Sequence, residues 1–142
     1  MDLLIATLAG WIAVQTGLSA VPPPHIELVT PTTMTETAFG PGVAASPLLR
    51  ALYSQPAGTV YLRKNWNSSN VRDRSELLHE LVHHFQSVHN LKYRCGAERE
   101  KLAYDLQIKW LREQGVADPY ELLEINGFFV VMAAVCRDTD HD

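Results

Sequence analysis

The sequence lacks the excess of positive charge that proteins use to bind nucleic acid. Its 12 Lys and Arg residues stand against 16 Asp and Glu residues, the net charge is -4, and no dense Lys/Arg cluster occurs. It also lacks a long apolar run, because the segment from Leu3 to Val14 is shorter than the roughly 20 residues that cross a bilayer. We therefore expect neither nucleic-acid binding nor membrane association.

Cysteine is scarce as well, and Cys95 and Cys136 are too few for a disulfide scaffold. They could form one disulfide, which would stabilise the fold by about 4 kcal/mol in the chain-entropy model. The alternative is two buried free thiols, since cysteine is often part of a core. A disulfide would favour a periplasmic or other extracytoplasmic location, whereas free thiols would favour the cytoplasm.

The remaining composition is that of an ordinary globular protein. A chain of 142 residues with 46% hydrophobic and 20% charged residues predicts one domain spanning residues 1–142. Leu4, Leu8 and Ile12 recur at helical spacing before Gly17, so we expect a buried first helix over residues 3–17. The alternative is a processed secretory signal, although Asp2 stands where a signal carries positive charge.

The middle of the chain predicts a small sheet. Residues 25–29 alternate as a short strand does, and residues 30–47 are rich in Thr, Pro and Gly, which predicts a loop with up to one helical turn. The apolar runs Leu49 to Tyr53 and Thr59 to Leu62 flank turn-forming residues 55–58 and predict a β-hairpin. We expect the second of these strands to lie at the edge of the sheet, where an extended peptide could lie beside it, held by main-chain hydrogen bonds.

The second half of the chain predicts helices. Asp73 followed by Glu76 has the form of a capping box at a helix start. The helices are expected over residues 73–90, 97–114 and 118–135, the last with a break at residues 126–127. The predicted fold is therefore α+β, with a small antiparallel sheet packed on the first two of these helices and the N- and C-terminal helices covering the rest.

The first of these helices contains an HExxH motif, His79-Glu80-Leu81-Val82-His83. Residues four apart lie on one helical face, so both imidazoles can reach the same metal ion. Glu80 would then lie beside the ion, where it can take a proton from a metal-bound water. The motif predicts a Zn²⁺ site with His79 and His83 as ligands and Glu80 as the general base.

A catalytic zinc needs a third protein ligand, and the next predicted helix offers Glu98 and Glu100. We favour Glu100, because the small Ala103 one turn further along allows that helix to approach closely. Glu98 lies nearer the helix start, where an acidic side chain interacts favourably with the helix dipole. Groups that could hold the outer nitrogens of the histidines are Tyr104, Asp105 and Gln107.

These residues carry a resemblance to known families. The HExxH motif followed by Glu100-Lys101-Leu102-Ala103 resembles the gluzincin branch of the zincin metallopeptidases and the Glu-x-x-Ala element of ImmA-type peptidases. Residues 78–86, Cys95 and residues 98–107 more closely resemble a family of small, uncharacterised bacterial HExxH proteins. The resemblance implies a zincin-like fold and a metal site, and it implies that the N-terminal helix belongs to the domain. The Asn-x-Glu context of thermolysin-like enzymes is missing, so no peptide-binding geometry is carried over.

The function predicted from these observations is that of a zinc-dependent hydrolase, specifically a metallopeptidase that acts on a peptide or protein substrate. We expect its site in a groove between the sheet edge and the HExxH helix, with Tyr61 or Arg63 near the rim. An oxyanion would also need a stabilising group. The candidates are Tyr104, Tyr93, His84 and His89.

Two alternatives stay open. In one, zinc holds together two helices of a non-catalytic structural or interaction module, and Glu80 is dispensable for its function. In the other, the histidines are incidental and the chain is a structural or interaction protein. Nothing in the sequence sets the oligomeric state.

Overall fold

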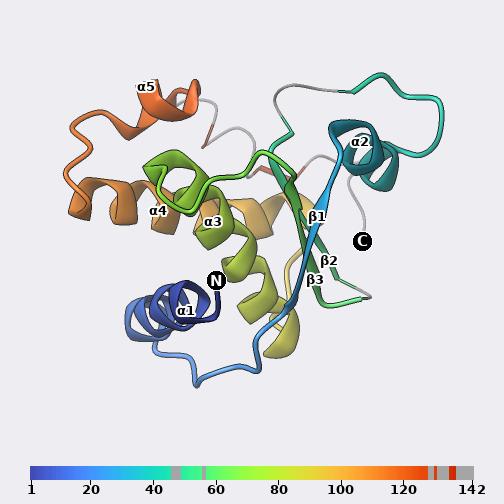
Figure 1. The fold of residues 1–142 in the computed structure, drawn as a ribbon. Helices are drawn as coiled ribbons and strands as arrows, with labels where there is room; N and C mark the ends of the chain where they lie inside the picture. Colours follow the sequence, from blue (N-terminus) through green and yellow to red (C-terminus); the bar gives the residue numbers. More distant parts are fainter. Residues whose placement is uncertain (46–48, 56, 128–129, 131–134, 137–142) are drawn as a thin grey trace.

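The HExxH helix lies at the centre of an α+β fold. The computed structural model describes residues 1–45, 49–55, 57–127, 130 and 135–136 (Figure 1). The elements in this part of the chain are α1 (Asp2–Thr16), β1 (His25–Val29), α2 (Pro31–Phe39), β2 (Ala51–Ser54), β3 (Thr59–Arg63), α3 (Val71–Val88), α4 (Gly96–Glu113) and α5 (Pro119–Leu123).

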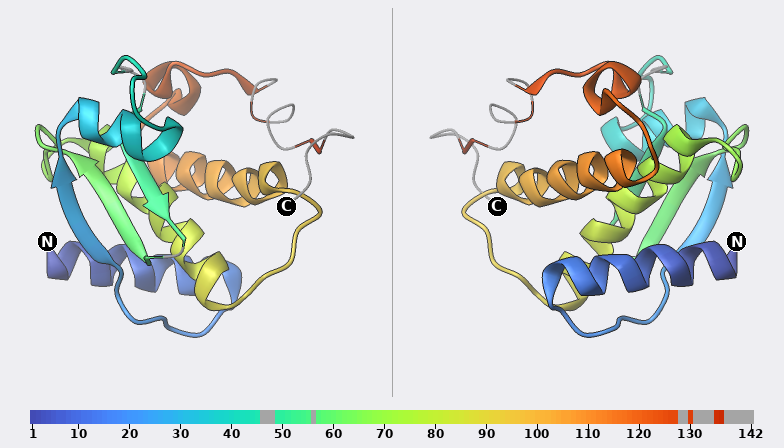
Figure 2. Two further views of the ribbon diagram at one scale, coloured as in Figure 1. Left: turned by 90° about the vertical axis from the view of Figure 1, so that its right-hand side faces the viewer. Right: turned by 90° about the vertical axis from the view of Figure 1, so that its left-hand side faces the viewer.

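Helix α3 runs through the middle of the fold and packs against the sheet, α1 and α4 (Figures 1 and 2). Five of its apolar residues recur at helical spacing and are at most 1% exposed: Leu77, Leu78, Leu81, Val82 and Phe85. They pack in one core with residues of α1, α4 and the sheet. This burial explains why α3 forms as predicted, since most helical stability in proteins comes from tertiary packing of an apolar face.

The hairpin prediction is confirmed, but the predicted antiparallel sheet is wrong. β2 and β3 pair antiparallel, with Ser54 opposite Thr59 and Ala51 opposite Leu62. β1 pairs with β3 in parallel, and the strand order is β1-β3-β2, so the sheet is mixed and β3 is its central strand, not its edge. A hairpin is a local feature of sequence, whereas the partner of β1 is chosen by packing across a long connection.

Helix α2 corrects the loop that we expected over residues 30–47. Thr30 caps the helix by accepting a hydrogen bond from the Thr33 backbone N–H at 3.1 Å, and Pro31 occupies the first helical turn. Met34 and Thr35 are buried, and α2 lies on the opposite side of the sheet from α3 (Figure 1). A good cap and this burial outweigh the low helix propensity of the threonines.

Helix α3 begins three residues earlier than the capping box predicts. The Asn70 side chain is the cap, accepting a hydrogen bond from the Asp73 backbone N–H at 3.0 Å. Asp73 is instead a buried residue of the first turn whose carboxylate pairs with Arg50 and accepts from the Asn67 N–H at 2.9 Å. Asn70 is as good a cap as Asp73 by residue type, and the pairing of Asp73 with Arg50 is a tertiary contact that the local sequence does not show.

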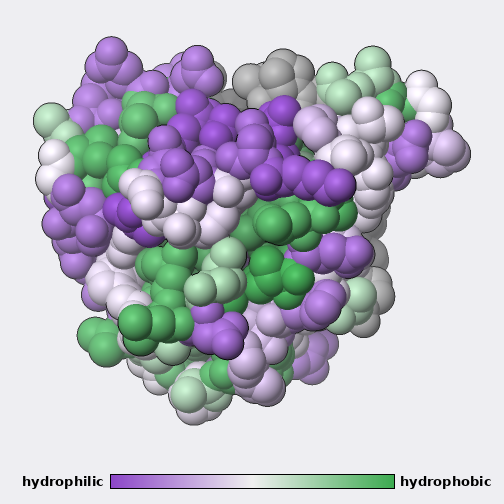
Figure 3. Space-filling view, in the orientation of Figure 1, coloured by the Kyte–Doolittle hydropathy of each residue, from purple (hydrophilic) through white to green (hydrophobic). Residues whose placement is uncertain are grey.

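Helix α1 forms and buries one face as expected, and it packs on α3 through Ile5, Leu8 and Ile12. Its outer face is also apolar, with Leu3 and Val14 exposed. Hydrophobic side chains gather over α1 and between α1 and β1, where a groove of about 480 Å³ lies (Figure 3). None of the helices in the described ranges is both long and apolar enough to span a membrane.

The C-terminal region is joined to the start of α4 by a disulfide between Cys95 and Cys136, whose Cα atoms are 5.9 Å apart. This settles the choice between a disulfide and free thiols. Helix α5 begins at Pro119 after the capping residue Asp118, as predicted, but ends at Leu123 with Glu124 in the left-handed conformation. The helix expected to resume over residues 128–135 lies largely outside the described residues.

Candidate metal centre

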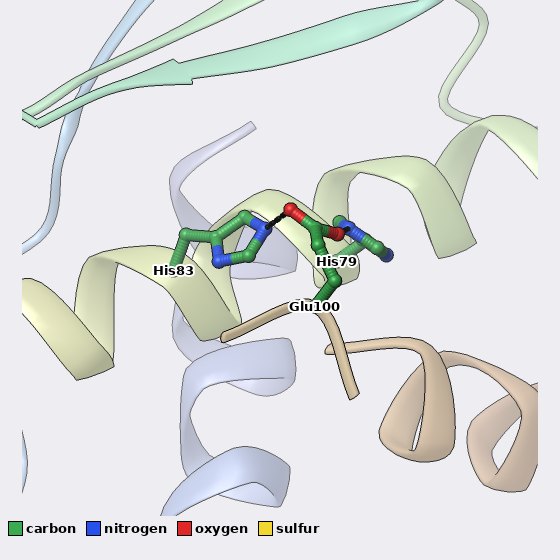
Figure 4. A group of neighbouring side chains, drawn as sticks. All are labelled: His79, His83 and Glu100. Carbon is green, nitrogen blue, oxygen red and sulfur yellow. Dashed lines mark hydrogen bonds and ion pairs between the residues drawn. The ribbon is translucent and has the colours of Figure 1, made fainter. Parts of the chain in front are cut away.

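The packing of α3 against α4 brings three of the predicted residues together. His79 and His83 lie one turn apart on α3, and Glu100 reaches between them from α4 (Figure 4). The Nε2 atom of His79 is 2.9 Å from one Glu100 carboxylate oxygen, and the Nε2 atom of His83 is 2.9 Å from the other. One nitrogen or oxygen atom from each residue thus lies within 4.8 Å of the others, the arrangement of a three-residue metal site.

Glu98, the alternative third residue, is absent from this cluster. Its carboxylate folds back on Arg94, accepting hydrogen bonds of 2.8 Å from the backbone N–H and from Nε. These hydrogen bonds lower the pKa of Glu98. Glu98 therefore serves the start of α4, and the structure places Glu100 with the histidines, as favoured from the sequence.

A buried glutamine fixes the orientation of His79. Its Nδ1 lies 2.8 Å from Gln107 Oε1, and Gln107 Nε2 donates to Ser75 Oγ at 3.1 Å. Because that donation sets the amide orientation, Oε1 accepts from His79 and Nε2 of the imidazole faces Glu100. Gln107 and Ser75 are at most 1% exposed. Of the groups predicted to hold the outer nitrogens, Gln107 does so, whereas Asp105 pairs with Lys101 at the surface.

A second glutamine, which the sequence analysis missed, does the same for His83. His83 Nδ1 lies 2.8 Å from Gln86 Oε1, and Gln86 Nε2 donates to Tyr93 Oη at 2.9 Å and to the Arg99 carbonyl at 3.0 Å. Gln86 follows His83 by three residues on α3, a spacing that places two side chains on one face. That spacing was the available signal. Both histidines thus have Nδ1 held by an amide and Nε2 directed to one point.

Opposite charges in the cluster shift the pKa values of His79 and Glu100 in opposite directions. Burial alone would lower the pKa of His79, but its hydrogen bond to Glu100 and the charges of Glu80 and Glu100 raise it to about 9. Burial opposes ionisation of Glu100, yet its hydrogen bonds to both imidazoles hold its pKa far below the ordinary value. The metal-free site therefore holds a proton on His79 Nε2 where a cation would sit, and metal binding must displace that proton.

Glu80 lies beside this cluster and not in it. Its side chain lines the same groove as His79 and His83, and the residue is 9% exposed. Burial raises the pKa of Glu80, and the charges of His79 and His83 partly offset the effect. A carboxylate with a raised pKa is a stronger base, which suits a group that takes a proton from water.

The cluster opens into a groove of about 350 Å³ between the sheet and the two helices. Residues 49–53, which include most of β2, form one wall. The other wall is formed by Glu76, His79, Glu80, His83, Glu100 and Tyr104. The groove therefore lies at the sheet edge beside the HExxH helix, as expected, but that edge is β2.

Tyr61 and Arg63, expected near the rim, do not line this groove. Side chains alternate along a strand, and the neighbouring residues Val60 and Leu62 face the core at 0% exposure. Tyr61 and Arg63 therefore face the other side of the sheet.

Of the four residues considered for an oxyanion, Tyr104 alone lines the groove. Its ring centroid lies 4.7 Å from that of His79. Burial and the nearby charges of Glu100, Glu76 and Glu80 raise the pKa of Tyr104 to about 12, so the phenol keeps its proton at neutral pH. His84 and His89 bind backbone carbonyls elsewhere, and Tyr93 accepts from Gln86.

The donor set fits Zn²⁺. Two neutral imidazoles and one carboxylate are ligands that zinc takes in catalytic sites, where a fourth position is left for water. The hydrogen bonds from each Nδ1 are those that metal-bound histidines make in proteins. The fold and the cluster define a class: a small α+β domain with a candidate His-His-Glu metal centre between two packed helices.

The chain belongs to the family described as "Domain of unknown function (DUF6647)", whose model matches residues 1–142. Comparisons with curated proteins and with solved structures each gave no match.

Proposed function

We propose that this protein is a zinc-dependent hydrolase, specifically a metallopeptidase. One observation carries the proposal: Nε2 of His79, Nε2 of His83 and the Glu100 carboxylate converge within 4.8 Å at the wall of an open groove. Glu80 lines the same groove and supplies the base that hydrolysis needs. The HExxH motif supports the same chemistry from the sequence.

In this proposal His79, His83 and Glu100 would hold Zn²⁺, which would supply Lewis-acid polarisation of the scissile carbonyl and lower the pKa of a water molecule. Glu80 accepts the proton of that water and passes it to the leaving amine. Tyr104 keeps its phenol proton and donates a hydrogen bond to the developing oxyanion. Gln107 and Gln86 hold the imidazoles in the tautomer that leaves each Nε2 available.

The substrate would lie along β2 and not along β3. β2 is an edge strand in the described sheet, and it forms the wall opposite the histidines. An extended peptide can pair with a strand edge through main-chain hydrogen bonds, which hold it without regard to sequence. This placement moves the predicted peptide-binding strand to the other member of the hairpin.

The disulfide between Cys95 and Cys136 supports a proposal for the cellular compartment of the protein. Cysteine bridges persist in oxidising compartments and are rare in the cytosol. We therefore place the protein outside the cytoplasm as part of this proposal.

Substitution of Glu80 tests the proposed role. We expect Glu80→Gln to lower kcat by roughly 10²–10⁴-fold while zinc content stays the same, because a general base contributes about that much. The control is Glu36→Gln, which removes an exposed carboxylate from α2 on the far side of the sheet. Activity of Glu80→Gln equal to that of the control would exclude Glu80 as the base.

A second experiment, removal of zinc together with a screen of peptides, distinguishes the non-catalytic alternative. If zinc only staples α3 to α4, removing it with a chelator lowers the melting temperature, and the wild type hydrolyses no peptide of a diverse library.

A further inference from the structure

The candidate site continues into a smaller recess of about 150 Å³ beyond His83. Its walls are Tyr53, Gln55, His83, Gly96, Arg99 and Glu100. Three of these, Tyr53, His83 and Glu100, also line the main groove. A substrate group that leaves the candidate centre past His83 therefore enters this recess directly.

Arg99 is the single cation among the described residues that line the recess. Glu100 is the single acid there, and its two oxygens are engaged by His79 and His83. Glu98, the other acid on this turn of α4, is engaged by Arg94. Neither carboxylate neutralises Arg99.

The partner of the Arg99 side chain is neutral. Its Nη1 donates to Gln55 Oε1 at 2.7 Å, and no ion pair of Arg99 occurs within the described part of the chain. Arg50, Arg72 and Arg94, by contrast, each pair with a carboxylate. No ion pair of Arg74 or Arg112 occurs among the described residues either, but these two guanidinium groups each lie over an aromatic ring. A guanidinium offers five N–H donors in a planar fork that matches a carboxylate, and a single amide oxygen satisfies one of them.

The position of Arg99 is fixed relative to the candidate centre. Gln86 Nε2 donates to the Arg99 carbonyl at 3.0 Å while Gln86 Oε1 accepts from His83. The main chain of Arg99 is thereby held by the same buried amide that orients a candidate ligand. The backbone of Arg99 is thus placed by a rigid contact, and its side chain extends from there to Gln55 on the β2–β3 turn.

We infer that Arg99 determines substrate specificity by binding a carboxylate of the substrate in this recess. The inference rests on the proposed function and adds a substrate class to it: peptides with a carboxylate next to the cleaved bond. That carboxylate is either an acidic side chain or the free C-terminus of the peptide. On binding it would replace the neutral amide of Gln55 with a charge-assisted, two-point contact.

The test compares matched peptides by mass spectrometry with the zinc-loaded full chain. One set has neutral side chains and an amidated C-terminus, a second adds one Glu at each position in turn, and a third has neutral side chains and a free C-terminus. We expect kcat/KM to be roughly tenfold or more higher for the second or third set, since hydrogen bonds to charged groups are worth more than neutral ones. Whichever set is favoured identifies the source of the carboxylate.

Arg99→Gln should remove that preference, chiefly through KM, and Arg99→Lys should keep part of it because the charge remains. Lys101→Gln is the matched control. It removes one exposed positive charge from the same helix, at a position that lines neither the main groove nor the recess. A preference that survives in Arg99→Gln, or a wild type without preference for carboxylates, would overturn the inference.

A binding measurement separates this inference from the proposed function. Two hydroxamate probes that chelate zinc, one carrying a carboxylate and the other its methylamide, are titrated into zinc-loaded wild type and Arg99→Gln. Tighter binding of the carboxylate probe to wild type alone supports the inference even if no peptide is cleaved. Equal binding of both probes overturns the inference and leaves the metal site intact. A wild type that takes up no zinc overturns both.

Discussion

Helix α3 carries histidines of two kinds, and their surroundings differ in one respect. His84 uses both ring nitrogens on the protein itself, with Nδ1 2.9 Å from Tyr53 Oη and Nε2 2.7 Å from the Pro22 carbonyl. His79 and His83 each give Nδ1 to a glutamine amide and direct Nε2 to a shared carboxylate. His84 and His79 are equally buried, at 6% exposure. Burial therefore does not distinguish a packing histidine from a candidate ligand, whereas the direction of the second nitrogen does.

Loss of zinc is the largest effect that this comparison predicts. His79→Ala or His83→Ala should reduce zinc from about one ion per chain to none, because a three-residue site loses a ligand. His84→Ala removes the same side chain from the same helix and should leave the zinc content unchanged. Elemental analysis of the three variants, purified without a histidine tag, measures this. Equal zinc loss in all three would mean that the distinction between the two kinds is wrong.

Weaker zinc binding should follow when the supporting amides are removed. Gln107→Ala and Gln86→Ala should each lower zinc affinity by about 10–100-fold, the usual effect of losing a group that orients a metal-bound histidine. Gln114→Ala, at the exposed end of α4, is the matched control. Competition with a chromogenic chelator gives the affinities. Unchanged affinity in both variants would show that the amides serve packing alone.

His84 should matter for stability instead. We expect His84→Ala to lower the free energy of unfolding by about 1–3 kcal/mol, since the Tyr53 hydroxyl and the Pro22 carbonyl each lose a hydrogen-bond partner. Urea denaturation of metal-free wild type and variant measures the difference. A variant as stable as wild type would contradict the structural role assigned to His84.

The protonation of His79 predicts a smaller effect in the metal-free protein. Its pKa is raised from 6.5 to about 9 on folding. Protonated His79 therefore stabilises the folded state fully below about pH 6.5, and this contribution is lost as the pH rises through about 9. We expect the stability difference between wild type and His79→Ala to fall by about 1–2 kcal/mol between pH 7 and 9.

Urea denaturation at each pH, with zinc removed, gives this difference. Zinc-loaded wild type should not show the loss, because the ion takes the place of the proton. A difference that does not vary between pH 7 and 9 would contradict the assignment of the proton to His79.

The sequence predicted local features well. The spacing of Leu77, Leu81 and Phe85 predicted α3, and the turn residues 55–58 predicted the hairpin. The close approach permitted by Ala103, which is fully buried, favoured Glu100 over Glu98. Each of these depends on residues close together in the chain or on one helical face.

The features that the sequence did not predict depend on contacts between distant segments. The parallel pairing of β1 with β3 is set by packing and not by a turn, and so is the exposure of the β2 edge. Helix α2 forms because Met34 is buried, although its threonines are poor helix formers. The capping role predicted for Asp73 is wrong because its pairing with Arg50, 23 residues away, is invisible in the local sequence.

The most direct test of the central claim is a crystal structure of zinc-loaded protein with diffraction data collected on both sides of the zinc absorption edge. The account predicts one anomalous peak at about 2.0–2.2 Å from Nε2 of His79, Nε2 of His83 and a Glu100 oxygen, with both Nδ1 atoms still bonded to Gln107 and Gln86. A structure in which both imidazoles keep their hydrogen bonds to Glu100 and zinc lies elsewhere, or nowhere, would contradict it.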